Sequence, residues 1–89
     1  MQISIQSLEV TYNQVPYRFI VKKVANNRNE VSFHCWAPED HLQAKELIKN
    51  DVLLFEWDHQ REELKAHAEN PVSEPIRQAI QKHFSMERA

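Results

Sequence analysis

The first third of the chain alternates between hydrophobic and polar residues. Apolar side chains occupy every second position in residues 8–12 and again in residues 17–21. A period of two is typical of a β-strand with one buried face, so each segment predicts a strand. The short connection between them contains Asn13 and Pro16, which favour turns. We therefore expect a β-hairpin in which Pro16 limits pairing where the second strand begins.

Residues 31–36 continue the alternation and predict a third strand. Apolar residues stand at positions 31, 33 and 35, after an Asn-rich segment over residues 26–29 that favours a turn. The third strand should therefore pair antiparallel with the second. In the resulting meander Leu8, Phe19 and Phe33 share one face, which we expect to carry the core.

Two isoleucines near the N-terminus break the parity of the first strand. Ile3 and Ile5 occupy odd positions, whereas Leu8 and Val10 occupy even ones. A shift of one residue moves side chains to the opposite face of a sheet. Either the strand contains a β-bulge near residues 6–7, or the two isoleucines face a second buried surface.

The middle of the chain predicts a helix and two more strands. Pro38, Glu39 and Asp40 suit the first turn of a helix, which we expect to run to about residue 49. Residues 52–57 form a short apolar run typical of a strand covered on both faces. Residues 62–69 combine helix-forming composition with strand-like alternation. We favour a strand there, joined to the previous one by a hairpin connection over residues 58–62.

The C-terminal segment carries a helical pattern. Ser73 follows Asn70-Pro71-Val72 and suits the N-cap of a helix. The spacing i, i+3, i+4, i+7 and i+8 places on one stripe Ile76, Ala79, Ile80, His83 and Phe84. Residues 1–89 are therefore expected to form a single α+β domain, an antiparallel sheet of four to five strands with this C-terminal helix packed on the core and one shorter helix.

The composition is that of an ordinary globular domain. Hydrophobic residues make up 42% and charged residues 27% of the 89 residues, so the chain should fold. No apolar run approaches the ~20 residues of a membrane-spanning helix, and the N-terminus lacks the features of a signal peptide. We therefore expect a cytoplasmic protein without a membrane partner.

The chain contains no glycine, and this limits both the ligand-binding motifs it can contain and the residues available for positive φ. Walker and dinucleotide-binding loops need glycine for tight turns and for close approach of the backbone to phosphate, so both motifs are excluded. Positions with positive φ should fall to asparagine or aspartate, and the cluster at residues 26–29 is the expected supplier.

The single cysteine has a structural interpretation that we prefer. Cys35 and its neighbour His34 should point to opposite sides of a strand, so they cannot form a nucleophile and base pair. Cys35 shares parity with Phe33, which predicts a small buried hydrophobic residue.

Two polar clusters are better explained as solvated surface residues than as metal-binding or catalytic sites. His59, Glu63 and His67 are spaced by four, but the outer pair would lie about 12 Å apart on a helix, too far for one metal ion. Glu56 and Asp58 show no sign of burial that would tune them for acid–base catalysis. We therefore assign no catalytic residue, no metal and no cofactor, and we favour a protein that is not an enzyme.

The strongest candidate site is an apolar patch on the polar face of the meander. By parity Ile20 and Trp36 share this face with Arg18, Lys22 and His34. An exposed apolar patch is typical of a partner surface, unless the helix expected over residues 38–49 covers it. The pattern therefore predicts a small non-enzymatic protein-interaction or accessory module, which binds an unknown protein or a second copy of itself as a homodimer.

Single-stranded nucleic-acid binding through the basic N-terminal hairpin is the alternative. Arg18, Lys22, Lys23 and Arg28 occur close to aromatic residues, a mixture that can bind phosphates and stack on bases. The formal net charge of -2 and the small number of cations oppose this interpretation. A small enzyme or metal-binding protein is the third interpretation.

Overall fold

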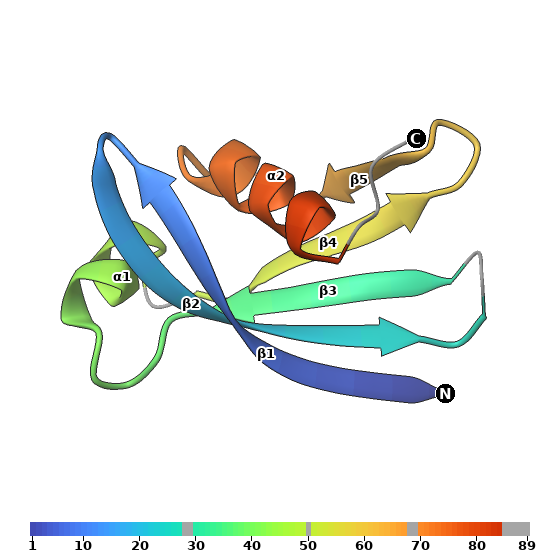
Figure 1. Ribbon diagram of the computed structural model, residues 1–89, viewed down its shortest axis with the longest axis horizontal. Coiled ribbons are helices and arrows are strands. Elements are labelled where there is room, and N and C mark those ends of the chain that lie inside the picture. The colour runs from blue at the N-terminus through green and yellow to red at the C-terminus, as the bar shows by residue number, and fades with distance from the viewer. Residues whose placement is uncertain (28–29, 50, 68–69, 85–89) are drawn as a thin grey trace.

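The computed structural model describes residues 1–27, 30–49, 51–67 and 70–84. Its centre is a five-stranded antiparallel sheet in which each strand pairs with its neighbours along the chain (Figure 1). The strands are β1 (Gln2–Tyr12), β2 (Val15–Ala25), β3 (Val31–Trp36), β4 (Leu53–Asp58) and β5 (Glu63–Ala66). The helix α1 (Leu42–Leu47) connects β3 to β4, and α2 (Ser73–His83) follows β5. The α+β fold expected from the sequence is confirmed.

The β1–β2 hairpin is regular along its whole length. Its register runs without interruption from Gln2 opposite Ala25 to Tyr12 opposite Val15. The two turn residues both have positive φ, as a type I′ turn requires. The continuous register excludes the bulge expected near residues 6–7. Ile3 and Ile5 therefore lie on the face opposite Leu8, but they are exposed rather than buried.

Positive φ occurs at different residues from those expected. The described residues with positive φ are Asn13, Gln14, Lys49 and Glu62. Asn26 and Asn27 are not among them, and the remaining two residues of that cluster, 28–29, lie outside the described residues. Asn13 agrees with the predicted residue type, but Gln14, Lys49 and Glu62 do not, because position in a turn also decides where the chain must reverse. Lys49, for example, lies directly after the C-cap of α1, where helices often place a left-handed residue.

The hydrophobic core lies between α2 and one face of the sheet, here called the core face. The sheet contributes Leu8, Val10, Phe19, Val21, Phe33, Cys35, Leu53, Phe55 and Leu64. The helix adds Ile76 and Ile80, both fully buried. Contacts of α2 with β1 and β5 show that it spans the sheet from one edge strand to the other. The predicted packing of the C-terminal helix on the Leu8, Phe19 and Phe33 face is confirmed.

The first turn of α2 differs from the predicted one. Val72 occupies the N-cap position and Ser73 is the first helical residue, so the prediction that Ser73 caps the helix was wrong. The side chain of Asn70 accepts a hydrogen bond from the backbone N–H of Val72 at 3.0 Å. The main-chain carbonyl of Asn70 accepts another from Ser73 at 2.9 Å. Asn70 thus holds the backbone that enters the helix, a role that Ser73 was expected to fill.

The helix α1 is shorter than the sequence predicts. Its N-cap is His41, whose Nδ1 accepts a hydrogen bond from the Ala44 N–H at 3.3 Å. Pro38 lies in a preceding turn, closed by the His41 N–H and the Pro38 carbonyl at 3.1 Å. The predicted start at residues 38–40 was wrong because an imidazole fills the capping role three residues further on. Ala44 and Ile48 join the core, and α1 stands at the end of the sheet that holds the hairpin turn (Figure 1).

The last two strands confirm one prediction and correct another. Within the ambiguous segment 62–69, residues 63–66 form the strand β5, with Leu64 buried under α2, and residues 68–69 lie outside the described residues. The strand β4 buries Leu53 and Phe55, whereas Leu54 is half-buried and Glu56 exposed. It is therefore covered on one face only, not on both. No helix within the described residues is long and apolar enough to cross a membrane.

Candidate functional site

The face of the sheet that points away from α2, here called the open face, carries the predicted site. Strand register assigns its side chains because alternate residues point to opposite sides. They are Ile3, Ile5, Ser7 and Glu9; Arg18, Ile20, Lys22 and Val24; Ser32, His34 and Trp36; Leu54, Glu56 and Asp58; Glu63 and Lys65. With α2 on the core face and α1 at one end of the sheet, the described residues leave most of this face uncovered.

Two pairs of predicted residues are direct cross-strand neighbours. Ile20 of β2 lies opposite Trp36 of β3, and Lys22 lies opposite His34. All four side chains are half-buried. An aliphatic and aromatic pair therefore stands next to a polar pair on the same two strands. The structure brings these four residues together, as their parity predicts.

Arg18, the fifth predicted residue, lies at the margin of this group. It is opposite Glu9 on β1, beyond the end of β3, which reaches only to the partner of Ile20. Its side chain is exposed and borders a hollow that Pro38 and His41 also line. Arg18 thus extends the open face toward α1 without contact with β3.

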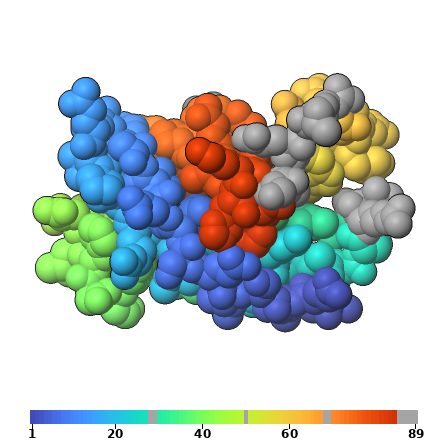
Figure 2. Space-filling model, viewed as in Figure 1, coloured from blue at the N-terminus to red at the C-terminus, as the bar shows by residue number. Residues whose placement is uncertain are grey.

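Aliphatic residues extend the open face beyond the predicted patch. Ile3 and Ile5 are 54% and 62% exposed, respectively. Ile3 lies opposite Val24, and Ile5 belongs to the same row of side chains as Leu54. Figure 2 shows the dark blue N-terminal part of β1, which contains both isoleucines, at the outer surface of the molecule. The most exposed hydrophobic side chains of the open face are therefore on β1 and not beside Trp36 on β3.

Trp36 lies where the open face meets α1. Together with Lys45 and Ile48 it lines a small hollow at the end of the sheet. Trp36 is half-buried there, whereas Ile3 and Ile5 in the N-terminal half of β1 are exposed.

Both charged side-chain types occur on each side of the central strand of the open face. The cations Arg18 and Lys22 are on β2, on one side of the central strand β3. The carboxylates on the other side are Glu56 and Asp58 of β4 and Glu63 of β5. One cation, Lys65, lies among them, opposite Glu56, and one carboxylate, Glu9, lies on the other side, opposite Arg18. Within the described residues neither Arg18 nor Lys22 has an ion pair, whereas Glu56 lies 3.1 Å from the imidazole of His67.

Sequence reasoning missed the β4 and β5 part of this face. Leu54 stands inside an apolar run in which inward and outward residues look alike, so no alternation separates it from Leu53 and Phe55. Glu56 and Asp58 could be placed only once the register between β3 and β4 was known. For Ile3 and Ile5 the signal was present, since their parity already separated them from Leu8.

The residues considered for catalysis are kept apart. Cys35 is fully buried in the core, where burial raises the pKa of its thiol to about 12. His34 lies on the opposite face, as its parity predicts. His67 pairs with Glu56, and Glu63 lies 3.9 Å from Arg61. Among the described residues no three histidine, cysteine or acidic side chains gather as metal ligands.

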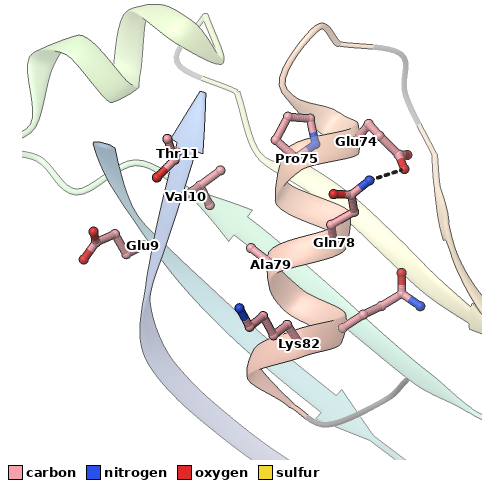
Figure 3. Close-up of a pocket in the computed structure, with 9 residues that line it drawn as sticks. Glu9, Val10, Thr11, Glu74, Pro75, Gln78, Ala79 and Lys82 are labelled. Atoms are coloured by element: carbon pink, nitrogen blue, oxygen red, sulfur yellow. Dashed lines mark hydrogen bonds between the residues drawn. The ribbon is translucent and has the colours of Figure 1, made fainter. Parts of the chain in front are cut away.

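A second hollow lies on the other side of the molecule, between β1 and α2 (Figure 3). It is an open groove of about 640 Å³ lined by Val10, Pro75 and Ala79 together with charged residues. Glu74 accepts hydrogen bonds from the side chains of Arg77 and Gln78. The Arg77 guanidinium lowers the pKa of Glu74 to about 2, and Glu74 in turn raises the pKa of Arg77. Glu74 and Arg77 therefore satisfy each other along the helix surface.

Comparisons with protein-family models, curated proteins and solved structures find nothing that matches this chain. Its function must therefore be inferred from its own residues and their arrangement.

Proposed function

We propose that this protein is a non-enzymatic interaction module that binds another protein chain through its open face. The observation that supports this is a group of aliphatic residues at the β1 edge of an uncovered sheet face, where Ile3 and Ile5 are more than half exposed and Val24 lies opposite Ile3. Antiparallel sheets commonly keep one face in water, but that face is then polar. Exposed aliphatic residues grouped on such a face are typical of a protein–protein contact.

Burial of this group would contribute a useful part of a binding free energy. Full burial of one isoleucine side chain is worth about 1.5–3 kcal/mol. Val24 lies opposite Ile3 on the same face and is already half-buried. Trp36 adds an aromatic group of the kind that is enriched among the residues that dominate binding energy.

The proposal is tested by Ile5→Asp, with Leu42→Asp as the matched control. Ile5 is 62% exposed on the open face, and Leu42 is 68% exposed on α1. Both substitutions place a carboxylate on an already solvated position, so the free energy of unfolding should change by less than about 0.5 kcal/mol. Ile5→Asp should abolish the capture of a bound protein by the immobilised chain, and Leu42→Asp should leave that capture unchanged.

Trp36→Ala extends the same experiment to the half-buried part of the face. We expect weaker capture together with a loss of stability, because the indole ring is half-buried in the folded chain. Equal capture by the wild-type protein, Ile5→Asp and Trp36→Ala would show that the open face is not the binding surface.

Single-stranded nucleic acid is the second candidate ligand for this face. In its favour, Arg18 and Lys22 share the open face with Trp36, so cations stand near an aromatic ring. Lys23, however, lies on the core face with its Nζ 5.5 Å from the centre of the Phe84 ring. The carboxylates of β4 and β5 would also repel a polyanion. A salt-sensitive shift of a labelled oligonucleotide that is lost in Lys22→Glu would favour this candidate over a protein partner.

A further inference from the structure

The N-terminal half of β1 is an unprotected edge of the sheet. Within the described residues β1 pairs only with β2, and Figure 1 shows its dark blue first half at the margin of the molecule. Proteins usually protect such an edge with charged side chains, a proline or a β-bulge. Residues 1–7 contain no charged side chain and no proline, and the register with β2 is continuous from residue 2. The main chain of this edge is therefore open to pairing with another strand.

The geometry of the hairpin decides which main-chain groups of β1 point to its free edge. In a two-residue hairpin the residues beside the turn, here Tyr12 and Val15, exchange both main-chain hydrogen bonds. Hydrogen-bonded and non-hydrogen-bonded pairs then alternate along the two strands. The even-numbered residues of β1 therefore bond to β2, and the odd-numbered residues direct their N–H and C=O groups outward. Ile3 and Ile5, both exposed, are among these.

The sequence around Ser4 reads the same in both directions. Residues 2–6 are Gln-Ile-Ser-Ile-Gln. Two such segments paired antiparallel about Ser4 would place Ile3 opposite the partner's Ile5 and Ser4 opposite the partner's Ser4. Gln2 would then lie opposite the partner's Gln6. Odd-numbered residues face odd-numbered residues in this register, so the outward main-chain groups of both copies meet. The edge is therefore complementary to itself about a two-fold axis.

We infer that β1 pairs antiparallel with β1 of a second copy, in the register centred on Ser4, so that the two sheets become one continuous sheet. The inference goes beyond the proposed function, because it uses the main-chain edge of β1 and leaves the open face uncovered. The two-fold axis stands perpendicular to the sheet, so both open faces point to the same side. Ile3 and Ile5 of the two copies then form one aliphatic group, with Val24 beside Ile3 in each copy.

The other half of β1 is less suited to a partner strand. Glu9 and Thr11 line the groove beside α2 together with Lys82, so the helix borders β1 there (Figure 3). A register centred on Ser7 would use this half and would place Ile5 opposite the partner's Glu9. The register centred on Ser4 pairs residues 1–7 alone and keeps every side-chain contact uncharged. A strand of another protein would need a matching pattern of its own, which a second copy already has.

Charge substitution at Ser4 tests both the partner and the register. Ser4 faces the partner's Ser4 in a non-hydrogen-bonded pair, where side chains approach most closely. Ser4→Lys alone and Ser4→Asp alone should each form the dimer at least about tenfold more weakly than the wild-type protein, because like charges then lie directly opposite each other. An equimolar mixture of the two variants should recover the dimer, because lysine then faces aspartate.

Solution mass is the readout, since a dimer has twice the chain's 10.6 kDa. Thr11→Lys and Thr11→Asp are the matched controls, because Thr11 is exposed on the same strand but lies outside the paired segment. They should leave the mass unchanged. Ser4 lies opposite Lys23 of β2, so unfolding midpoints of all variants should show that each one is folded. A variant that had unfolded could not recover the dimer on mixing.

Amide hydrogen exchange locates the contact on the main chain. The N–H groups of Ile3 and Ile5 should exchange at least about tenfold more slowly in the wild-type dimer than in monomeric Ser4→Lys, because pairing protects them. The N–H groups of Glu9 and Thr11 point to the same edge beyond the paired segment and should exchange equally fast in both. Equal exchange at Ile3 and Ile5 in dimer and monomer would exclude the pairing of the two edges.

The possible failures separate this inference from the proposed function. A wild-type chain that stays monomeric up to about 1 mM would overturn the inference. Capture of a different protein that depends on Ile5 would then still support the proposed function. A dimer whose mass is the same in Ser4→Lys, in Ser4→Asp and in their mixture, or one that the Thr11 controls dissociate instead, would exclude the register centred on Ser4. If the chain is monomeric and captures nothing that depends on Ile5, both proposals fall.

Discussion

In this chain, which has no glycine, other residues adopt the left-handed backbone conformations that glycine usually adopts in turns. Asn13 and Gln14 have φ of 51° and 66° in the turn between β1 and β2. Asparagine tolerates this region because its short side chain can bond locally, but the Cβ of glutamine lies close to the following carbonyl oxygen. The hairpin forms because the type I′ twist matches the twist of its strands. The steric strain of the turn is therefore located mainly at Gln14.

Gln14→Gly should stabilise the protein. Glycine removes the Cβ conflict, worth about 1–2 kcal/mol, at an entropic cost of about 0.5–1 kcal/mol in the unfolded chain. We expect a gain of up to about 1 kcal/mol in the free energy of unfolding, measured with denaturant. Thr11→Gly in the strand before the turn is the control and should lose stability, since its backbone is already extended. A loss in Gln14→Gly similar to that of the control would contradict this account of the turn.

The thiol of Cys35 should be inert in the folded protein. It is fully buried, and its pKa is raised to about 12, so almost no thiolate exists at neutral pH. A thiol reagent at pH 7 should label native protein at least about 100-fold more slowly than protein in denaturant, because labelling requires opening of the core. Equal rates in the two states would mean that Cys35 is accessible from the surface.

At the scale of elements, the sequence predicted best where one face of a strand is buried. Alternation located β1, β2 and β3, and the stripe of Ile76 and Ile80 located α2. Helix starts were harder, because hydrogen bonds from particular side chains decide them. His41 caps α1 and Asn70 holds the entry to α2, and neither role has a periodic signal.

Ile80→Ala tests whether α2 is part of the only core that the described residues contain. Ile80 is fully buried between α2 and the sheet. Its truncation should cost about 2–5 kcal/mol in the free energy of unfolding, from lost burial and from the cavity left behind. Lys82→Ala, an exposed position two residues later on the same helix, should change stability by less than about 0.5 kcal/mol. Denaturant unfolding of both variants decides, and a loss below 0.5 kcal/mol in both would refute the packing of α2.

At the scale of the whole molecule, strand parity correctly placed the candidate site residues on the open face. It did not show which side chains of that face are exposed. Ile20 and Trp36 are on the predicted face, yet the more exposed side chains on it are Ile3 and Ile5. The exposure of these side chains depends on where α1 packs. The position of the carboxylates on the open face depends on the register of β4. Both are set by the connection over residues 37–52, whose conformation follows from tertiary packing rather than from local pattern.

The order of strands in the sheet has a consequence for how the chain folds. Because the order in space equals the order in sequence, every strand pairs with one that is near it along the chain. The hairpin turns close short loops at a small entropic cost, although the long β1–β2 hairpin also pairs residues as distant along the chain as Gln2 and Ala25. The main exception is the contact of α2 with β1, which joins the two ends of the chain. The docking of α2 onto β1 therefore holds the first strand and the last helix in one hydrophobic core.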